Sequence, residues 1–303
     1  MSDIRFDGKV AVITGAGAGL GRIHALELAR RGAMIVVNDL GSALDGSGQT
    51  QKAADSVVEE IIKDGGKAVS NYDSVSTVQG GENITACALD TFGSLDILVN
   101  NAGIVRDHSF TKMTEDEWDA VLTVHLKGAY CVTRPALAAM KERNYGRIIF
   151  TSSGVGLYGN FGQANYASAK MGLIGLMNVL KLETAKNNIR INTIAPNAVT
   201  RMTSSIFPPN LAELLKPEYI TPLLLYLASE ENNDNGMIFN CFSGYYSRTA
   251  IVCSKGVLLG DGKTNISPEE IRSHWNEITA LEEPKTLGSI VESFGYIAPL
   301  LNK

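Results

Sequence analysis

The stretch that decides the fold is Thr14-Gly15-Ala16-Gly17-Ala18-Gly19-Leu20-Gly21. An apolar run over residues 9–14 leads into it, and apolar residues at helical spacing follow over residues 22–29. We therefore expect the glycines on a tight turn between a strand and a helix, where a side chain would hold a bound anion away from the backbone. Because free N–H groups at a helix start attract negative charge, the pattern predicts a pyrophosphate-binding turn.

A second apolar run, residues 34–38, ends at Asp39, eighteen residues after Gly21. That is close to the spacing at which an acidic residue binds the adenosine ribose of a dinucleotide. The carboxylate would repel the 2′-phosphate of NADP, so the sequence favours NAD, although Arg22 could still accommodate that phosphate. The Gly- and Ser-rich stretch 40–49 predicts a loop near the adenosine.

Strand-like runs alternate with helical patterns along most of the chain. The runs fall near residues 9–14, 34–38, 67–72, 95–99, 146–151, 189–194 and 236–241. This alternation predicts an α/β fold with a doubly wound, mostly parallel, seven-stranded Rossmann-type sheet. Ligands are then expected at the carboxyl ends of the strands. In the plainest alternative, the glycines only make a tight turn in an α/β protein.

Length and composition indicate one large domain, residues 1–253, with a short extension over residues 254–303 that carries one predicted helix. The chain has 303 residues, 45% hydrophobic and 19% charged, and a formal net charge of −5. No run of basic residues and no stretch of eighteen apolar residues occurs, so we expect a soluble protein with neither nucleic acid nor membrane as a partner. The four cysteines show no CxxC spacing, so no metal site is expected and a reducing compartment is indicated.

The extension contains a strong helix start at Ser267-Pro268-Glu269-Glu270, followed by Ile271, Trp275 and Ile278 on one predicted face. We expect this apolar face to pack on its own domain, with a partner surface as the alternative.

The residues for chemistry follow the strand at 146–151. Ser153 comes directly after it, and Tyr166 and Lys170 lie four residues apart on a predicted helix, so they share one face. Lowering a tyrosine pKa from about 10 to neutrality takes roughly 4 kcal/mol, whereas an exposed ion pair supplies only about 0–1 kcal/mol. The pair must therefore lie in a sheltered cleft if Tyr166 is a base, with Ser153 holding the substrate oxygen. Alternatively, Tyr166 is a packed ring and Lys170 a solvated head.

Three further features have both a functional and a structural interpretation. Asn100-Asn101-Ala102-Gly103 follows a strand, where it either lines a cofactor pocket or forms a polar turn. Asp73 either binds the adenine or caps a helix. His125 either orients a water or a lysine, or has a structural role. The predicted catalytic residues are His125, Ser153, Tyr166 and Lys170. The predicted cofactor-binding residues are Thr14, Gly15, Gly19, Leu20, Gly21, Asp39, Asp73, Val75, Asn101, Ala102, Gly103, Tyr166, Lys170 and Ala198.

Together these residues resemble the short-chain dehydrogenase/reductase family over roughly the first 250 residues. The stretches 38–41, 124–128, 158–166 and 194–198 are similar to the (3R)-hydroxyacyl-CoA dehydrogenase domains of multifunctional β-oxidation enzymes. The resemblance implies NAD-linked oxidation of (3R)-3-hydroxyacyl-CoA to 3-ketoacyl-CoA in fatty-acid β-oxidation, a homodimer and a peroxisomal location. It also implies that His125 takes the place of the family's usual asparagine.

The chain departs from the resemblance at several positions. Thr200 is one residue earlier than the family's usual nicotinamide-contacting threonine, and residues 239–246 replace a smaller glycine-rich turn. The final Leu301-Asn302-Lys303 does not match a peroxisomal tripeptide, which leaves a cytoplasmic location as the alternative. Neither a hydratase nor a sterol-carrier domain follows, so a stand-alone enzyme and a module of a longer chain are both compatible with the sequence.

The leading hypothesis is an NAD-dependent, R-specific hydroxyacyl-CoA dehydrogenase with Tyr166 as general base, in which Arg106, His108 and residues 202–215 border the substrate. A dehydrogenase of steroids or other secondary alcohols is the alternative among enzymes, because the catalytic set recognises only the carbinol. From another class, the chain could be a non-catalytic NAD-binding sensor or scaffold.

Overall fold

The computed structural model describes residues 3–198, 215–260 and 265–301. The chain divides into two compact units, Met1–Arg248 and Thr249–Lys303, and each is described by itself. Thr200 and all but the end of the 202–215 segment lie outside the described residues. The domain boundary expected at residue 253 stays a prediction.

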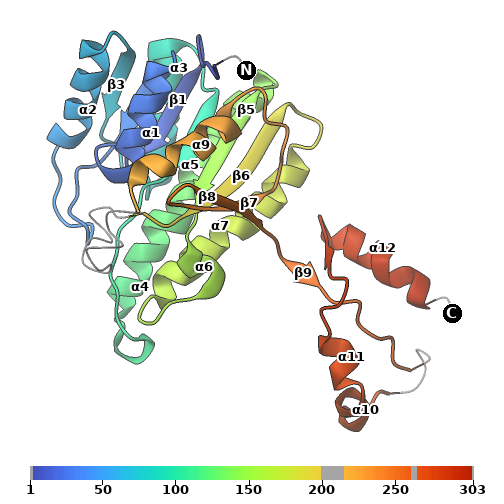
Figure 1. Ribbon diagram of the computed structural model, residues 1–303. Helices are drawn as coiled ribbons and strands as arrows, with labels where there is room; N and C mark the ends of the chain where they lie inside the picture. The colour runs from blue at the N-terminus through green and yellow to red at the C-terminus, as the bar shows by residue number, and fades with distance from the viewer. Residues whose placement is uncertain (1–2, 199–214, 261–264, 302–303) are drawn as a thin grey trace. The chain divides into compact units, whose positions relative to one another are not determined.

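The first unit is built on a sheet of eight strands in the order β3-β2-β1-β4-β5-β6-β7-β8 (Figure 1). Strands β1 to β7 pair in parallel. The α/β, doubly wound prediction is thus confirmed, and all seven predicted strands are present. They are β1 (Val10–Thr14), β2 (Met34–Asn38), β3 (Lys67–Asn71), β4 (Ile97–Asn100), β5 (Gly146–Thr151), β6 (Ile189–Pro196) and β7 (Ile238–Phe242).

The predicted number of seven strands is wrong by one, because β8 (Tyr245–Thr249) adds an edge to the sheet. Only Ser243 and Gly244 connect β7 to β8, both with positive φ (48° and 77°), as in the two-residue turns that join antiparallel strands. The side chains of β8 are exposed or half-buried. An exposed edge strand lacks the continuous apolar run that marks the buried strands, so the search for such runs did not predict β8.

Helices cover both faces of the sheet. One face packs against α1 (Gly19–Arg30), α2 (Lys52–Lys63) and α9 (Thr221–Ala228), and the other against α3 (Val78–Phe92), α5 (Gly128–Glu142) and α7 (Ala164–Glu183). Side chains alternate between the two cores along β1: Ala11 and Ile13 enter the first, Val10 and Val12 the second. Burial on both faces explains why the strands read as unbroken apolar runs.

The carboxyl ends of the strands carry buried polar side chains. Thr14, Asn38, Asn100 and Thr151 are each the last or nearly the last residue of a strand and are at most 7% exposed. The strand order reverses between β1 and β4, which is where a doubly wound sheet opens a crevice for ligands. The fold therefore gathers polar groups at the edge where the crevice lies.

Shorter helices surround this edge. They are α4 (Glu115–Leu122), which begins with the predicted capping box of Thr114 and Glu117, α6 (Gly154–Tyr158), and the single turns η1 (Phe110–Lys112) and η3 (Pro217–Tyr219). A π-helical segment, η2 (Thr123–Lys127), joins α4 to α5. None of the helices in the described ranges combines the length and apolarity needed to cross a membrane.

The second unit contains a two-stranded antiparallel sheet and three helices. Its elements are β9 (Val252–Cys253), α10 (Pro268–Ser273), α11 (Trp275–Thr279), β10 (Lys285–Thr286) and α12 (Ile290–Leu301). The predicted helix start is confirmed, since Ser267 and Glu270 form a capping box. The prediction of one helix is wrong, because α10 ends at Ser273 and His274 separates it from α11, which places Ile271 and Trp275 on separate helices.

A buried histidine connects two helices of the first unit and makes its stability depend on pH. His24 of α1 is 0% exposed; its Nδ1 lies 2.9 Å from Thr221 Oγ1 of α9, and its Nε2 has no partner among the described residues. Burial lowers the pKa of His24 to about 3. Below pH ~6.5 the unfolded chain therefore binds a proton at this histidine, whereas the folded chain does not. The free energy of unfolding consequently falls as the pH drops below that value.

We expect His24→Gln to weaken this pH dependence. The slope of unfolding free energy against pH between pH 6.5 and 4 should decrease by up to ~1.4 kcal/mol per pH unit, because one proton uptake on unfolding is removed. Urea unfolding at a series of pH values measures it. Thr221→Val is the matched control: it removes the partner of His24 but keeps the ring, so stability should fall with the slope retained. An unchanged slope in His24→Gln would contradict the assignment.

Candidate active site

The glycine turn joins the end of β1 to the start of α1 and needs glycine for space. A Cβ on Gly15 would lie 2.8 Å from Ala102 Cα, and one on Gly21 would lie 2.3 Å from the carbonyl oxygen of Gly15. Gly15 also has a φ of 64°, which other residues rarely adopt. Gly19 and Leu20 continue the turn into α1 and line a cleft at this edge of the sheet.

Thr14 ties this turn to the one after β4. Its Oγ1 accepts hydrogen bonds from the N–H groups of Asn101 and Ala102, each at 3.0 Å, and donates to the carbonyl of Val99 at 3.3 Å. The Asn101 amide returns a bond to the Thr14 carbonyl at 2.9 Å. The two turns flank the point where the strand order reverses, so Thr14 fixes the floor of the cleft.

Asp39 at the end of β2 faces the glycine turn. Its Oδ2 accepts the N–H of Gly17 at 2.8 Å, and its Oδ1 accepts the N–H of Gly41 at 2.7 Å. Each carboxylate oxygen keeps a further lone pair, so the group can still accept from ribose hydroxyls. Arg22, the residue that could favour a 2′-phosphate, is instead paired with Glu60 of α2.

The cleft brings together nine of the predicted cofactor-binding residues: Gly15, Gly19, Leu20, Asp39, Asp73, Val75, Asn101, Ala102 and Gly103. It has an open volume of about 1010 Å³. The Asp73 carboxylate accepts from the amides of Asn71 and Asn83 at 2.8 and 2.7 Å, while Thr77 caps the following helix, so the helix-cap alternative for Asp73 is wrong. Ala198 does not line this cleft; it is 6% exposed and belongs to the hydrophobic core that the sheet forms with α1, α2 and α9.

Ser153, Tyr166 and Lys170 converge beside β5. Ser153 caps α6, with its Oγ accepting the N–H of Val155 at 3.1 Å. Tyr166 and Lys170 lie one turn apart on α7, with the ammonium nitrogen 5.5 Å from the centre of the phenol ring. Lys170 is 3% exposed and donates to the carbonyl of Thr151 at 2.6 Å. The sheltered environment predicted for the pair is confirmed.

Burial shifts both ionisable groups toward their neutral forms. It raises the pKa of Tyr166 to about 12, an effect that a hydrogen bond with Ser153 opposes and the charge of Asp107 reinforces. It lowers the pKa of Lys170 to about 7. The phenol is therefore protonated at neutral pH and needs additional positive charge beside it to act as a base.

His125 lies in the π-helical segment η2, a rare geometry that often marks functional sites. Its ring stands edge-on to Tyr166, with centroids 5.1 Å apart and planes at 83°. Nε2 lies 2.8 Å from the carbonyl oxygen of Ile104, and a Cβ on Gly103 would fall 2.2 Å from Cε1. Burial, with the charge of Lys170, lowers the pKa of His125 well below its usual value, so the ring is neutral. It both anchors the turn after β4 and borders Tyr166.

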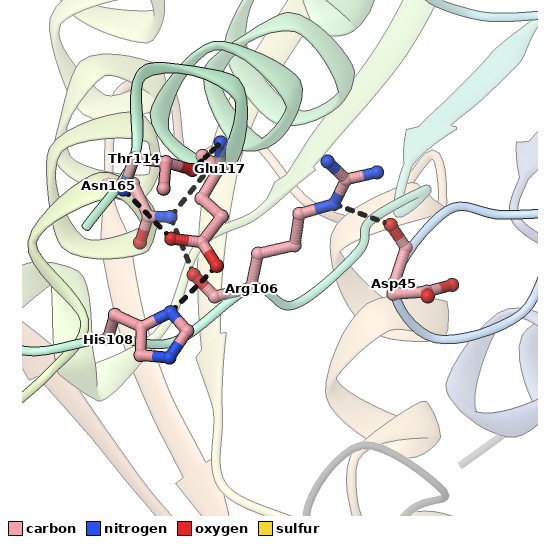
Figure 2. A network of polar contacts seen from close by, with 6 residues as sticks. All are labelled: Asp45, Arg106, His108, Thr114, Glu117 and Asn165. Carbon is pink, nitrogen blue, oxygen red and sulfur yellow. Dashed lines mark hydrogen bonds and ion pairs between the residues drawn. The ribbon is translucent and has the colours of Figure 1, made fainter. Parts of the chain in front are cut away.

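Asn165 is a site residue to which the sequence analysis assigned no role. It is 0% exposed, and its Nδ2 donates to the carbonyls of Arg106 and Glu117 at 2.9 and 3.0 Å (Figure 2). Its Oδ1 accepts the N–H of Tyr166 at 2.7 Å. It thus joins α7, α4 and the segment after β4. No local sequence signal identifies it, because its burial and its partners come from the packing of α7 against α4 and the segment after β4.

Two residues expected to border the substrate have partners within the protein. His108 pairs with Glu117 at 2.7 Å, and Arg106 donates from Nε to the carbonyl of Asp45 at 2.7 Å (Figure 2). Gln163 donates to Asp107 at 2.8 Å, so the segment after β4 is held to the start of α7 twice.

Within residues 3–198, 215–260 and 265–301, no group of three or more His, Cys, Asp or Glu side chains could hold a metal ion. All four cysteines are free.

Comparison with known proteins agrees with this geometry. The family model for short chain dehydrogenase matches residues 9–210. The chain is 48% identical over 302 residues to peroxisomal multifunctional enzyme type 2 of Mus musculus, covering 100% of this chain and 41% of that protein. It is 50% identical over 277 residues to the peroxisomal hydratase-dehydrogenase-epimerase of Saccharomyces cerevisiae, covering 91% of this chain and 31% of the yeast protein.

A solved structure is similar over nearly the whole chain. Full-length peroxisomal multifunctional enzyme type 2 from Drosophila melanogaster aligns with a TM-score of 0.84 and 42% identity, covering 99% of this chain and 50% of that one. The chain thus spans half or less of the length of these three relatives.

We expect Asn165→Ala to slow turnover of any substrate that uses Tyr166, by about 10- to 100-fold, because the tyrosine loses its register against His125. Buried groups left unpaired should also lower stability by about 1–3 kcal/mol each. Asn232→Ala is the matched control, since Asn232 is likewise 0% exposed and bonds Leu227 and Asp234 in a turn after α9. Steady-state rates and urea unfolding measure both effects. Equal rate losses in the two variants would mean that Asn165 acts only through stability.

Proposed function

The chain belongs to the short-chain dehydrogenase/reductase family, and we propose that it oxidises (3R)-3-hydroxyacyl-CoA to 3-ketoacyl-CoA with NAD as the hydride acceptor. The observation that carries this proposal is the convergence of Ser153, Tyr166 and Lys170 beside a cleft floored by a glycine turn. The similarity of the whole chain to multifunctional enzymes of the peroxisome supports the choice of substrate.

The residues of the cleft fit a dinucleotide. The glycine turn leaves no space for side chains where a pyrophosphate would approach the start of α1, and Asp39 presents a fixed carboxylate at the ribose position. The pairing of Arg22 with Glu60 leaves this carboxylate as the dominant charge there, which favours NAD over NADP. When bound, the oxidised cofactor supplies a hydride acceptor and a positive charge.

In the proposed mechanism, Tyr166 reacts as the phenolate after its own proton has passed to solvent, and it takes the hydroxyl proton while the hydrogen on C3 leaves as hydride to the acceptor. Ser153 donates a hydrogen bond to the substrate oxygen and holds it beside the phenol. Because burial has raised the pKa of Tyr166 to about 12, proton transfer depends on positive charge in the cleft, part of which Lys170 supplies when it is protonated. The neutral ring of His125 contacts the phenol ring edge-on and holds it in position.

The names of the relatives support an acyl-CoA substrate. The yeast relative is named a hydratase-dehydrogenase-epimerase, and the chain aligns with 31% of it, so we assign to this chain the dehydrogenase function within that name. The proposed place of action is the peroxisome, after the names of the relatives. We further propose a homodimer, which is supported by the exposed apolar side chains of Met171, Val179 and Leu182 on α7.

We expect NADH to form with (3R)- but not (3S)-3-hydroxybutyryl-CoA, and Tyr166→Phe to lower the rate by about 10²- to 10⁴-fold, as for loss of a general base. Tyr226→Phe, on α9, is the matched control and should keep its rate. Absorbance at the NADH band measures all three proteins with each enantiomer. Turnover of the (3S) form, or full activity in Tyr166→Phe, would contradict the proposal. NADH binding without turnover of either would point first to steroids and other alcohols, then to a non-catalytic module.

Asp39→Ala should change the choice of cofactor. Removing the carboxylate takes away both the ribose acceptor and the repulsion of a 2′-phosphate, so the ratio of kcat/KM for NAD to that for NADP should fall by about tenfold or more. Asp90→Ala, on the exposed side of α3, should leave the ratio unchanged. A ratio unaltered in Asp39→Ala would show that the selectivity lies in other residues.

A further inference from the structure

The loop between β2 and α2 forms a compact body of its own. We call residues 41–48 the cleft loop. Its base is closed where the N–H of Thr50 donates to the carbonyl of Leu40 at 3.2 Å, and within it the N–H of Ala43 donates to the carbonyl of Ser47 at 2.8 Å. A loop whose ends meet and whose interior makes its own bonds moves as a unit.

The cleft loop forms one wall of the dinucleotide cleft. Ser42, Ala43, Leu44 and Gly46 line that cleft, and Ala102, Gly103 and Ile104 line it from the turn after β4. The two walls meet at the loop tip, where a Cβ on Gly46 would lie 3.2 Å from the Cδ1 of Ile104. A ligand in the cleft is therefore bordered by a loop from β2 and a turn from β4.

Two hydrogen bonds fasten the cleft loop to the segment that follows Ile104. The N–H of Val105 donates to the carbonyl of Leu44 at 2.9 Å, and the Nε of Arg106 donates to the carbonyl of Asp45 at 2.7 Å (Figure 2). The Asp45 carboxylate accepts from the N–H and hydroxyl of Ser47 inside the loop. Its carbonyl is consequently held in place for Arg106.

Arg106 is itself fixed from the catalytic side. Its own carbonyl accepts the buried amide of Asn165, the residue next to Tyr166, and the turn that precedes it is anchored by His125 at Ile104. One residue thus connects the wall of the cofactor cleft to the helix that carries Tyr166.

We propose that Arg106 is a positioning residue that fastens the cleft loop over the bound dinucleotide and so slows cofactor release. The inference rests on the proposed function, because it places a dinucleotide in the cleft. Separation of the loop from residues 104–106 would widen the cleft at this wall, and it breaks the bonds made by Val105 and Arg106. The guanidinium bond is the one that a side-chain substitution removes.

The test is the rate of NADH dissociation, followed by the fluorescence change when excess NAD displaces it. We expect Arg106→Ala and Arg106→Lys each to release NADH about tenfold faster, equal to ~1.4 kcal/mol, because neither places an N–H at the Asp45 carbonyl as the guanidinium does. Arg190→Ala is the matched control: Arg190 also donates to backbone carbonyls, those of Asn187 and Ile189, at the opposite end of β6. It should release NADH at the wild-type rate.

Hydrogen exchange of the protein alone gives a second readout. Amide exchange over residues 42–48 and at Val105 should accelerate in both Arg106 variants and not in Arg190→Ala. Unchanged release in Arg106→Ala, wild-type release in Arg106→Lys, or equal acceleration in Arg190→Ala would each overturn the proposal. A wild-type protein that binds no NADH would overturn the cofactor assignment as well, whereas NADH binding without (3R)-hydroxyacyl-CoA turnover would overturn only the proposed substrate.

Discussion

The hydroxyl of Thr14 makes the junction on which the rest of the site depends. By accepting the N–H groups of Asn101 and Ala102, it locks the turn after β4 onto the end of β1. The glycine turn then has a rigid neighbour that excludes a Cβ at Gly15, and the turn after β4 has a fixed start from which Gly103 and Ile104 reach His125. A parallel sheet brings all these strand ends to one edge, so a single junction orders both the cofactor cleft and the catalytic side.

Burial controls the chemistry of the site as strongly as proximity does. Lys170, His125 and the ring of Tyr166 share a poorly solvated region, and each is shifted toward its neutral form. On the proposed function, a positively charged ligand group that enters this region would favour the phenolate form of Tyr166. Under the same proposal, proton removal by Tyr166 would thereby depend on the positive charge of the bound cofactor.

Local patterns predicted most of the fold and many of the residues that line the cleft. The glycine turn, Asp39 and the seven buried strands are each encoded within a few residues, because turn geometry and two-sided burial leave marks in short stretches of sequence. The eighth strand is exposed and the break at His274 is local, so neither altered the apolar pattern. Asn165, Arg106 and Gln163 form hydrogen bonds with residues 48 to 61 positions away in the sequence. Local patterns could not predict these bonds, because they depend on how α7 packs against the segment after β4. The shifts of Tyr166 and Lys170 likewise depend on burial, which only the fold determines.

The connection from Asn165 through Arg106 to the cleft loop shows how this fold can divide its tasks. The sheet edge and Thr14 hold the backbone groups that face the dinucleotide, and these leave little freedom for variation. Successive residues of the segment after β4 contact different parts of the structure. Ile104 contacts His125, and Val105 and Arg106 contact the cleft loop. Asp107 contacts Gln163, and His108 contacts Glu117. A displacement of this segment would therefore reach the cleft loop, His125 and the start of α7 together. On the proposed function, cofactor binding and the alignment of Tyr166 would both depend on the position of this one segment.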